Sequence, residues 1–170
     1  ETVPAEATVA AFSVDGVLAP MKAGAPDRQA KRDEPGKHAS GPAGYKEVGC
    51  GAVILYDAAG ERLETVRYGR MPEPKKPTLQ QQLAAEGAAL FAVRPDLRRV
   101  LLSDGALDNW RLLRELEQHW PAPPVPTVEI LDFCHACDHL KAGCDAAWGE
   151  STPRSHAEFE CLKTLLKEDE

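Results

Sequence analysis

The chain has 170 residues, of which 43% are hydrophobic and 28% charged, and a formal net charge of −7. These values are ordinary for a soluble protein and allow one domain with its own core, plus part of a second. They exclude a membrane-spanning helix, because no apolar run approaches the ~20 residues needed. The N-terminus does not resemble a signal peptide, and its lack of Met indicates an excerpt of a longer protein. The odd number of cysteines, five, favours reduced thiols or a metal over a disulfide framework, so we expect a cytoplasmic location.

The first half of the chain predicts three strands. Residues 9–18 are an apolar strand interrupted by one acid and closed by a glycine. Residues 23–45 are rich in Gly, Pro, Ala and mixed charge, which predicts a mobile loop. Residues 47–58 and 61–70 then form a β-hairpin through the turn Ala59-Gly60.

Two helices are predicted around a fourth strand. Thr78 and Gln81 have the spacing of a capping box at the start of an amphipathic helix. Residues 98–104 form an apolar strand after two arginines, which is typical of a central strand covered on both faces. Asp108 and Asn109 can cap the helix that follows.

The end of the chain predicts one more strand and two helices. Residues 127–133 read as the fifth strand, and helices are expected at 136–148 and 153–167. The whole order predicts an α/β fold, a ribonuclease-H-like mixed five-stranded sheet flanked by helices. Other α/β folds share this order.

Asp15 and Asp104 occupy similar places, each before a glycine and within or at the end of an apolar strand. In a ribonuclease-H-like sheet the first and fourth strands are neighbours, so these carboxylates can share a Mg²⁺ ion, which prefers oxygen ligands. A metal pair of this kind assists phosphodiester cleavage. Each Asp-Gly alone is more often a strand-end turn, but the pair on these two strands favours the metal site.

Basic residues that could contact DNA phosphates are few, and the net negative charge is unfavourable for such contacts. They form two groups, for which solvated surface is the commoner role: Arg67, Arg70, Lys75 and Lys76, and Arg94, Arg98 and Arg99.

A third cluster contains cysteine and histidine residues that could bind zinc: Cys134, His135, Cys137, His139 and Cys144. The spacing is poor for zinc, because adjacent residues of a strand point in opposite directions. The commoner outcome is buried thiols at a strand-to-helix junction, with the histidine bonded to backbone or to Asp132.

Several segments together resemble bacterial insertion-sequence transposases of the Kra group, within the Mutator-like superfamily of DDE transposases. They are VDGV at 14–17, the hairpin at 49–73, the helix after KKPTL at 75–79, LLSDGALDNW at 101–110 and LDFCHACDHLKAGCDAAWGE at 131–150. The resemblance is colinear from about Phe12 to Leu166.

The resemblance implies that Asp15 and Asp104 are the first two catalytic aspartates and bind Mg²⁺, for which Mn²⁺ can substitute. Asp132 and His135 match an Asp, two residues, His motif, and would support catalysis by orienting the scissile strand or a water molecule at the metal. Residues 9–136 would be the catalytic core and 137–170 the start of a helical insertion, with the third acid, a glutamate, beyond the end of this chain.

The implied activity is metal-dependent DNA cleavage and strand transfer, acting on transposon ends and target DNA. The intact enzyme would be a homo-oligomer without a membrane partner. Two alternatives stay open: a ribonuclease-H-like nuclease that uses Asp15, Asp104 and Asp132, and an inactive remnant that serves as a binding module, with zinc on Cys134 and Cys137.

Overall fold

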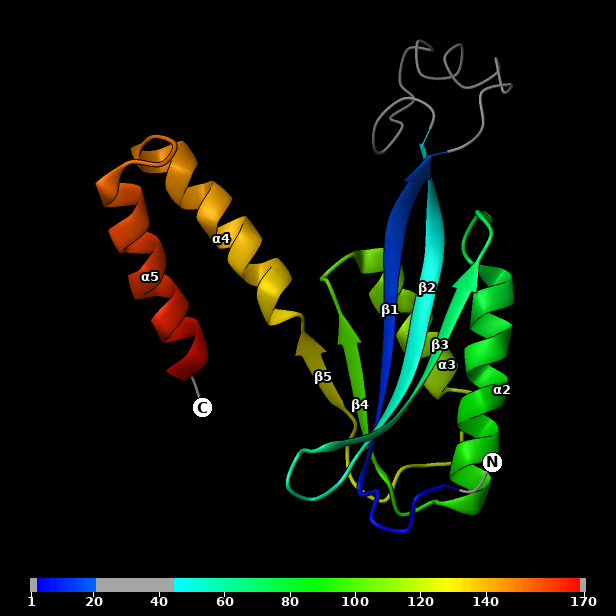
Figure 1. Cartoon of the computed structure of the whole chain (residues 1–170). Coiled ribbons are helices and arrows are strands. Elements are labelled where there is room, and N and C mark those ends of the chain that lie inside the picture. Colours follow the sequence, from blue (N-terminus) through cyan, green and yellow to red (C-terminus); the bar gives the residue numbers. More distant parts are fainter. Residues whose placement is uncertain (1–2, 21–44, 169–170) are drawn as a thin grey trace, which may run out of the picture.

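A five-stranded mixed sheet forms the centre of the molecule (Figure 1). The computed structural model describes residues 3–20 and 45–168, so the predicted loop at 23–45 lies outside them except for Tyr45. The strands are β1 (Val9–Pro20), β2 (Tyr45–Tyr56), β3 (Arg62–Arg70), β4 (Arg98–Ser103) and β5 (Val128–Leu131). The helices are α2 (Pro77–Val93), α3 (Leu107–Glu117), α4 (Phe133–Trp148) and α5 (Pro153–Glu168).

The strands lie in the order β3-β2-β1-β4-β5. β1, β2 and β3 pair antiparallel in sequence, whereas β4 pairs parallel with both β1 and β5. The predicted α/β class and mixed five-stranded sheet are therefore confirmed. The topology makes β1 and β4 direct neighbours at the centre of the sheet.

One face of the sheet carries the core. Ala10, Phe12 and Val14 alternate along β1 and are buried, as the two-residue period of a strand requires. α2 and α3 pack on this face and contribute buried leucines such as Leu83 and Leu113. The helices therefore hold β1 and β4 from one side.

The other face has no covering helix in the part of the chain that the structure describes. Its side chains line a cavity of about 620 Å³ that includes Val9, Ser13, Ile54, Val100 and Leu102. The prediction that the strand at 98–104 is covered on both faces is wrong, because β4 is buried only at alternate positions. Val100 and Leu102 are only partly buried, but because both are apolar the sequence resembles that of a fully buried strand.

The two predicted helix caps are also wrong. α2 begins at Pro77 after Lys76, and the carboxylate of Glu73 accepts hydrogen bonds from the backbone N–H groups of Thr78 and Leu79. Thr78 donates its hydroxyl to the same carboxylate instead of capping the helix. α3 begins earlier than predicted, after Ala106, so Asp108 and Asn109 lie inside its first turn.

α4 and α5 form a helical hairpin that projects beyond β5 (Figure 1). β5 ends at Leu131, earlier than predicted, and α4 begins at Phe133 and runs unbroken across the expected domain limit at 136/137. Asp145 on α4 joins the two helices by accepting a hydrogen bond from the hydroxyl of buried Ser155 on α5 at 2.6 Å, and it also accepts one from Lys141 of its own helix at 2.5 Å.

Gly87 allows α2 to approach Trp120, and we predict that Gly87→Ala destabilises the protein. A Cβ at Gly87 would lie 2.3 Å from the indole ring, which the packed core prevents from moving. Overpacking of this kind costs about 1–3 kcal/mol of unfolding free energy. The control is Gly143→Ala on α4, where a Cβ meets nothing within 4 Å and the helix should gain about 0.5–1 kcal/mol. Equal effects of both variants in urea denaturation would contradict the close packing.

The α4–α5 hairpin should lose stability in acid. The hydrogen bond from Lys141, followed by that from Ser155, lowers the pKa of Asp145 to about 2. A depressed carboxyl pKa stabilises the fold above the ordinary aspartate pKa, and that contribution is lost as the pH falls through the folded value. Asp145→Asn should therefore be less stable than the wild type at neutral pH, with a difference that shrinks toward pH 2 in a series of urea denaturations. Asp138→Asn, exposed on the same helix, is the control and should show no such pH-dependent difference.

Candidate functional site

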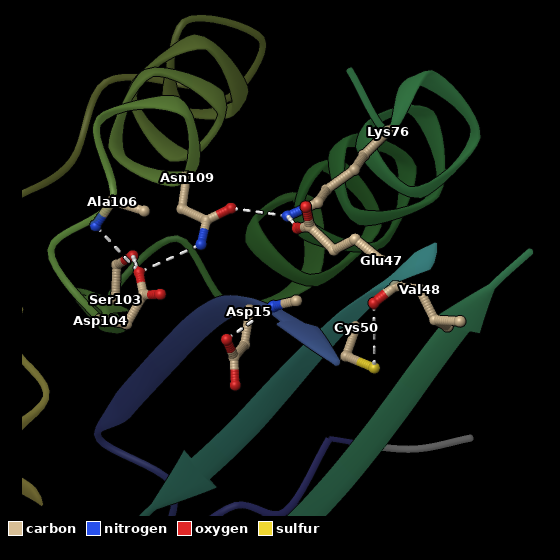
Figure 2. Close-up of polar contacts among 10 residues, drawn as sticks. Asp15, Glu47, Val48, Cys50, Lys76, Ser103, Asp104, Ala106 and Asn109 are labelled. Atoms are coloured by element: carbon tan, nitrogen blue, oxygen red, sulfur yellow. Dashed lines mark hydrogen bonds and ion pairs between the residues drawn. The ribbon is translucent and has the colours of Figure 1, made fainter. Parts of the chain in front are cut away.

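Asp104 lies directly after β4, where the chain turns into α3. Its Oδ1 atom accepts hydrogen bonds from the Ser103 hydroxyl at 3.1 Å, the Ala106 backbone N–H at 3.0 Å and the Asn109 side-chain amide at 3.1 Å (Figure 2). Gly105 has a φ of 93°, a left-handed conformation that favours glycine, so the predicted Asp-Gly turn exists here. The turn uses only one carboxylate oxygen, because Oδ2 has no polar partner among the described residues.

The carboxyl group of Asp104 is held in its ionised form. Burial is the largest single influence and opposes ionisation, but the hydrogen bonds from Ala106, Asn109 and Ser103, with the nearby His135, outweigh it. The pKa of Asp104 therefore lies below its ordinary value. A carboxylate that is ionised at neutral pH, with one oxygen unpartnered among the described residues, is a suitable cation ligand.

Asp15 lies within β1, which continues through it to Pro20, so the alternative of a strand-end turn does not apply here. Its side chain is exposed, on the opposite face from buried Val14. Within the described residues the carboxylate accepts only one hydrogen bond, from the next backbone N–H, that of Gly16 (Figure 2). Among the described residues, the other carboxylate oxygen of Asp15 is thus available to a ligand.

The strand register brings the two aspartates to equivalent positions. Val14 of β1 pairs with Ser103 of β4 in a parallel arrangement, and each aspartate is the next residue along its chain. Figure 2 shows both side chains in the same region, with the Asp15 carboxylate outside the hydrogen-bond network around Asp104. Each acid therefore directly follows the last residue paired between β1 and β4, two adjacent strands at the centre of the sheet.

A polar relay that the sequence did not reveal supports Asp104 from the side of α2 (Figure 2). Asn109 is only 4% exposed, and while its amide donates to Asp104, its Oδ1 atom accepts from Lys76 at 2.8 Å. Lys76 in turn forms an ion pair with Glu47 at 2.7 Å. The side chain of Glu47 lies against Gly16, where any Cβ would clash with it.

The relay explains the glycine after Asp15. A side chain at Gly16 would displace Glu47 and so disturb the contacts that lead to Asp104. The same residues line a cleft of about 770 Å³ beside Asp104. In the sequence, only the Val-Asp-Gly pattern pointed to this region. That pattern does not identify Glu47, Lys76 or Asn109 as members of the relay.

Asp132 and His135 have a structural role at the start of α4. The carboxylate of Asp132 caps the helix by accepting the backbone N–H of His135 at 3.0 Å. This cap aims His135 toward the cavity that Asp104 also lines. His135 thus joins the region of Asp104, while one oxygen of Asp132 is occupied by the helix.

The cysteines do not gather into a metal site. Cys137 and Cys144 are buried on α4, within the predicted helix, whereas Cys134 also lies on α4 instead of a strand and is exposed. Across residues 3–20 and 45–168, no group of three or more His, Cys, Asp or Glu side chains is placed to hold a metal ion. The described residues therefore assemble neither a zinc site on Cys134 and Cys137 nor a three-aspartate site with Asp132.

The two groups of basic residues that could contact DNA phosphates lie in different environments. Arg99 is buried in the core, and Arg94 donates to the backbone of the N-terminal segment, so the second group is mainly structural. It also lies at the start of β4, the opposite end from Asp104. In the first group, Lys75 and Lys76 line the cleft beside Asp104.

The chain matches no protein-family profile, no curated protein and no solved structure. Among the helices that the structure describes, none is long and apolar enough to cross a membrane.

We predict that Asn109→Ala raises the pKa of Asp104, because burial then opposes ionisation with one hydrogen bond fewer. Ionised Asp104 stabilises the fold above the ordinary aspartate pKa and loses this contribution as the pH falls through its depressed folded value. The variant should lose about 1–3 kcal/mol of unfolding free energy at neutral pH and less in acid. Carboxyl-detected NMR titration and urea denaturation measure the two effects.

The matched control for this variant is Asp108→Ala, the preceding residue, whose side chain is 92% exposed. It should leave the Asp104 titration in place. An Asp104 pKa that stays unchanged in Asn109→Ala would contradict the relay.

Proposed function

We propose that this chain is part of the catalytic domain of a DNA transposase, which cleaves and joins phosphodiester bonds with divalent metal ions. The observation that carries the proposal is the parallel register of β1 and β4, which gives Asp15 and Asp104 equivalent positions on adjacent strands. The strand order and directions are those expected of a ribonuclease-H-like sheet, and we propose that fold. The resemblance to Kra-group transposases supplies the class of reaction.

The donor set fits a hard divalent cation such as Mg²⁺ or Mn²⁺. Both aspartates keep a carboxylate oxygen without a polar partner among the described residues, and carboxylate oxygen is the ligand these ions prefer. Mg²⁺ retains several waters, so two protein ligands are compatible with binding. A cation held there would supply Lewis-acid assistance to phosphodiester cleavage.

The other residues of the site position these two carboxylates. Ser103, Ala106 and Asn109 fix one oxygen of Asp104 and favour its ionised form, so that the second oxygen stays available. Lys76 orients Asn109 through the relay from Glu47. Positioned charges of this kind contribute to catalysis because they need no rearrangement during the reaction.

The cleft beside Asp104 is where we propose that a DNA strand lies. Lys75, Lys76 and Arg111 supply its positive charge, although Glu47 and Asp108 each pair with one of these cations. With a net charge of −7, this chain can contribute only part of the affinity for DNA. The remainder, and the third acid, belong to other parts of the intact homo-oligomeric enzyme that we propose.

Calorimetric titration with Mn²⁺ tests the proposal in the wild type, Asp15→Asn and Asp104→Asn. Either substitution should abolish measurable binding, because each removes one of two ionic ligands. Asparagine keeps the size of the side chain, and in Asp104→Asn its amide oxygen can still accept the N–H of Ala106, so the turn should survive.

Asp108→Asn is the control, since Asp108 lines the same cleft but is solvated and lies on α3. It should bind Mn²⁺ as the wild type does. Binding that persists in either Asp15→Asn or Asp104→Asn would show that the two aspartates do not share an ion, and the proposed function would then lose its structural support.

A further inference from the structure

His135 and His139 lie four residues apart on α4, so they occupy neighbouring positions on one face of the helix. Their Nε2 atoms are 3.0 Å apart, and the ring planes are inclined at 76°. In a neutral pair, one Nε2 must carry a proton for the other to accept it. The helix thus brings two imidazole nitrogens together at its exposed surface.

This separation is that of an ordinary N–H···N hydrogen bond, and it is also short enough for both nitrogens to bind one metal ion. Two nitrogens bound to zinc at ~2.05 Å would be about 2.9 Å apart at a right angle and about 3.3 Å apart at a tetrahedral angle. The observed 3.0 Å falls between these limits. With the proton of each ring on Nδ1, both Nε2 lone pairs are available, and rotation about the side-chain torsions would direct them at one ion.

We propose that His135 and His139 form a binding site for a borderline transition-metal ion, of the class of Zn²⁺, Co²⁺ or Ni²⁺, with water completing the coordination. Imidazole nitrogen suits these ions, whereas Mg²⁺ and Mn²⁺ prefer oxygen. The site has two protein ligands, which agrees with the absence of a three-ligand group among the described residues. It does not rest on the proposed function.

The surroundings favour a cation. The two histidines line an open cavity of about 930 Å³ together with Asp104, and the side chains of Leu131, Leu140 and Leu162 form much of its wall. Asp104 supplies the carboxylate of this cavity, and the nearby His135 helps to lower the pKa of Asp104. A metal ion on the histidines would therefore meet a compensating negative charge.

The cysteines of α4 are not part of this site. Cys137 is two residues from His135, which places it about 200° around a helix with 3.6 residues per turn, and it is buried. Cys144 is seven residues further on the same buried side. The site therefore consists of the two histidines and differs from the zinc site on cysteines that the sequence suggested.

The test is a calorimetric titration of the whole chain with Zn²⁺ and Ni²⁺, under reducing conditions, for the wild type, His135→Gln and His139→Gln. Each variant should bind more than about tenfold more weakly, because a two-ligand site loses half of its protein donors. His139 is exposed, so His139→Gln should fold normally, and circular dichroism verifies this. Co²⁺ absorption spectra report nitrogen ligation independently of any activity.

Three controls decide between ligand sets. His119→Gln, outside α4, should bind as the wild type does, and so should Cys134→Ser. Asp15→Asn should lose Mn²⁺ but keep Zn²⁺, which separates this site from the carboxylate site. An unchanged affinity of His139→Gln for Zn²⁺ and Ni²⁺ would overturn the proposal. Loss of binding in Cys134→Ser, with binding retained in His139→Gln, would overturn it as well.

Discussion

The packing of Trp120 onto Phe12 and Gly87 is the contact on which the rest of the structure depends. The indole ring lies 4.4 Å from the ring of Phe12 on β1 and 5.3 Å from that of Phe91 on α2, measured between centroids. Its Nε1–H donates to the backbone oxygen of Ala84, so the ring is fixed in orientation as well as in position. Because Phe12 precedes Asp15 by three residues, the cluster also fixes the strand that carries the first acid. Aromatic clusters of this size supply both buried area and a specific geometry.

Arg99 anchors the second acid to the same cluster. Arg99 precedes Asp104 by five residues. Its guanidinium lies 4.0 Å from the ring centre of Phe91 and donates to the backbone oxygen of Pro121. Burial lowers the pKa of Arg99, although Glu117 opposes that effect, and Nε and Nη1 have no hydrogen-bond partner among the described residues. The face of the aromatic ring provides a partial substitute for them. In the sequence this residue looked like surface charge, because a buried arginine is rare and its partners come from distant elements.

The elements could be predicted from the sequence where the signal is local. The apolar run of β1, the hairpin turn between β2 and β3 and the apolar period of α2 identified the sheet and its helices, and with them the positions of Asp15 and Asp104. The helix starts were wrong because Glu73 caps α2 from outside the helix, and because Asp104 accepts the backbone N–H of Ala106, the residue before α3. The relay from Glu47 through Lys76 to Asn109 could not be predicted at all, since it joins three elements that only the folded chain brings together. Asp132 was assigned to a strand, but a carboxylate three residues before an accessible N–H is also a helix cap, and tertiary context favoured the cap.

Asp104 connects the two metal sites that we propose, because it borders both the cleft beside α2 and the cavity beneath α4. One of its oxygens is fixed by hydrogen bonds, so a cation in the cleft and a cation on the histidines would draw on the same negative charge. Neutralising that charge from one side weakens the attraction on the other, and thermodynamic linkage makes the effect equal in both directions. The cap on Asp132 would contribute to this coupling, since it fixes the backbone of His135 at the start of α4, close enough for His135 to help lower the pKa of Asp104. The Asp-x-x-His spacing would then act less through a direct chemical step than by setting how strongly His135 on α4 and Asp104 after β4 interact electrostatically.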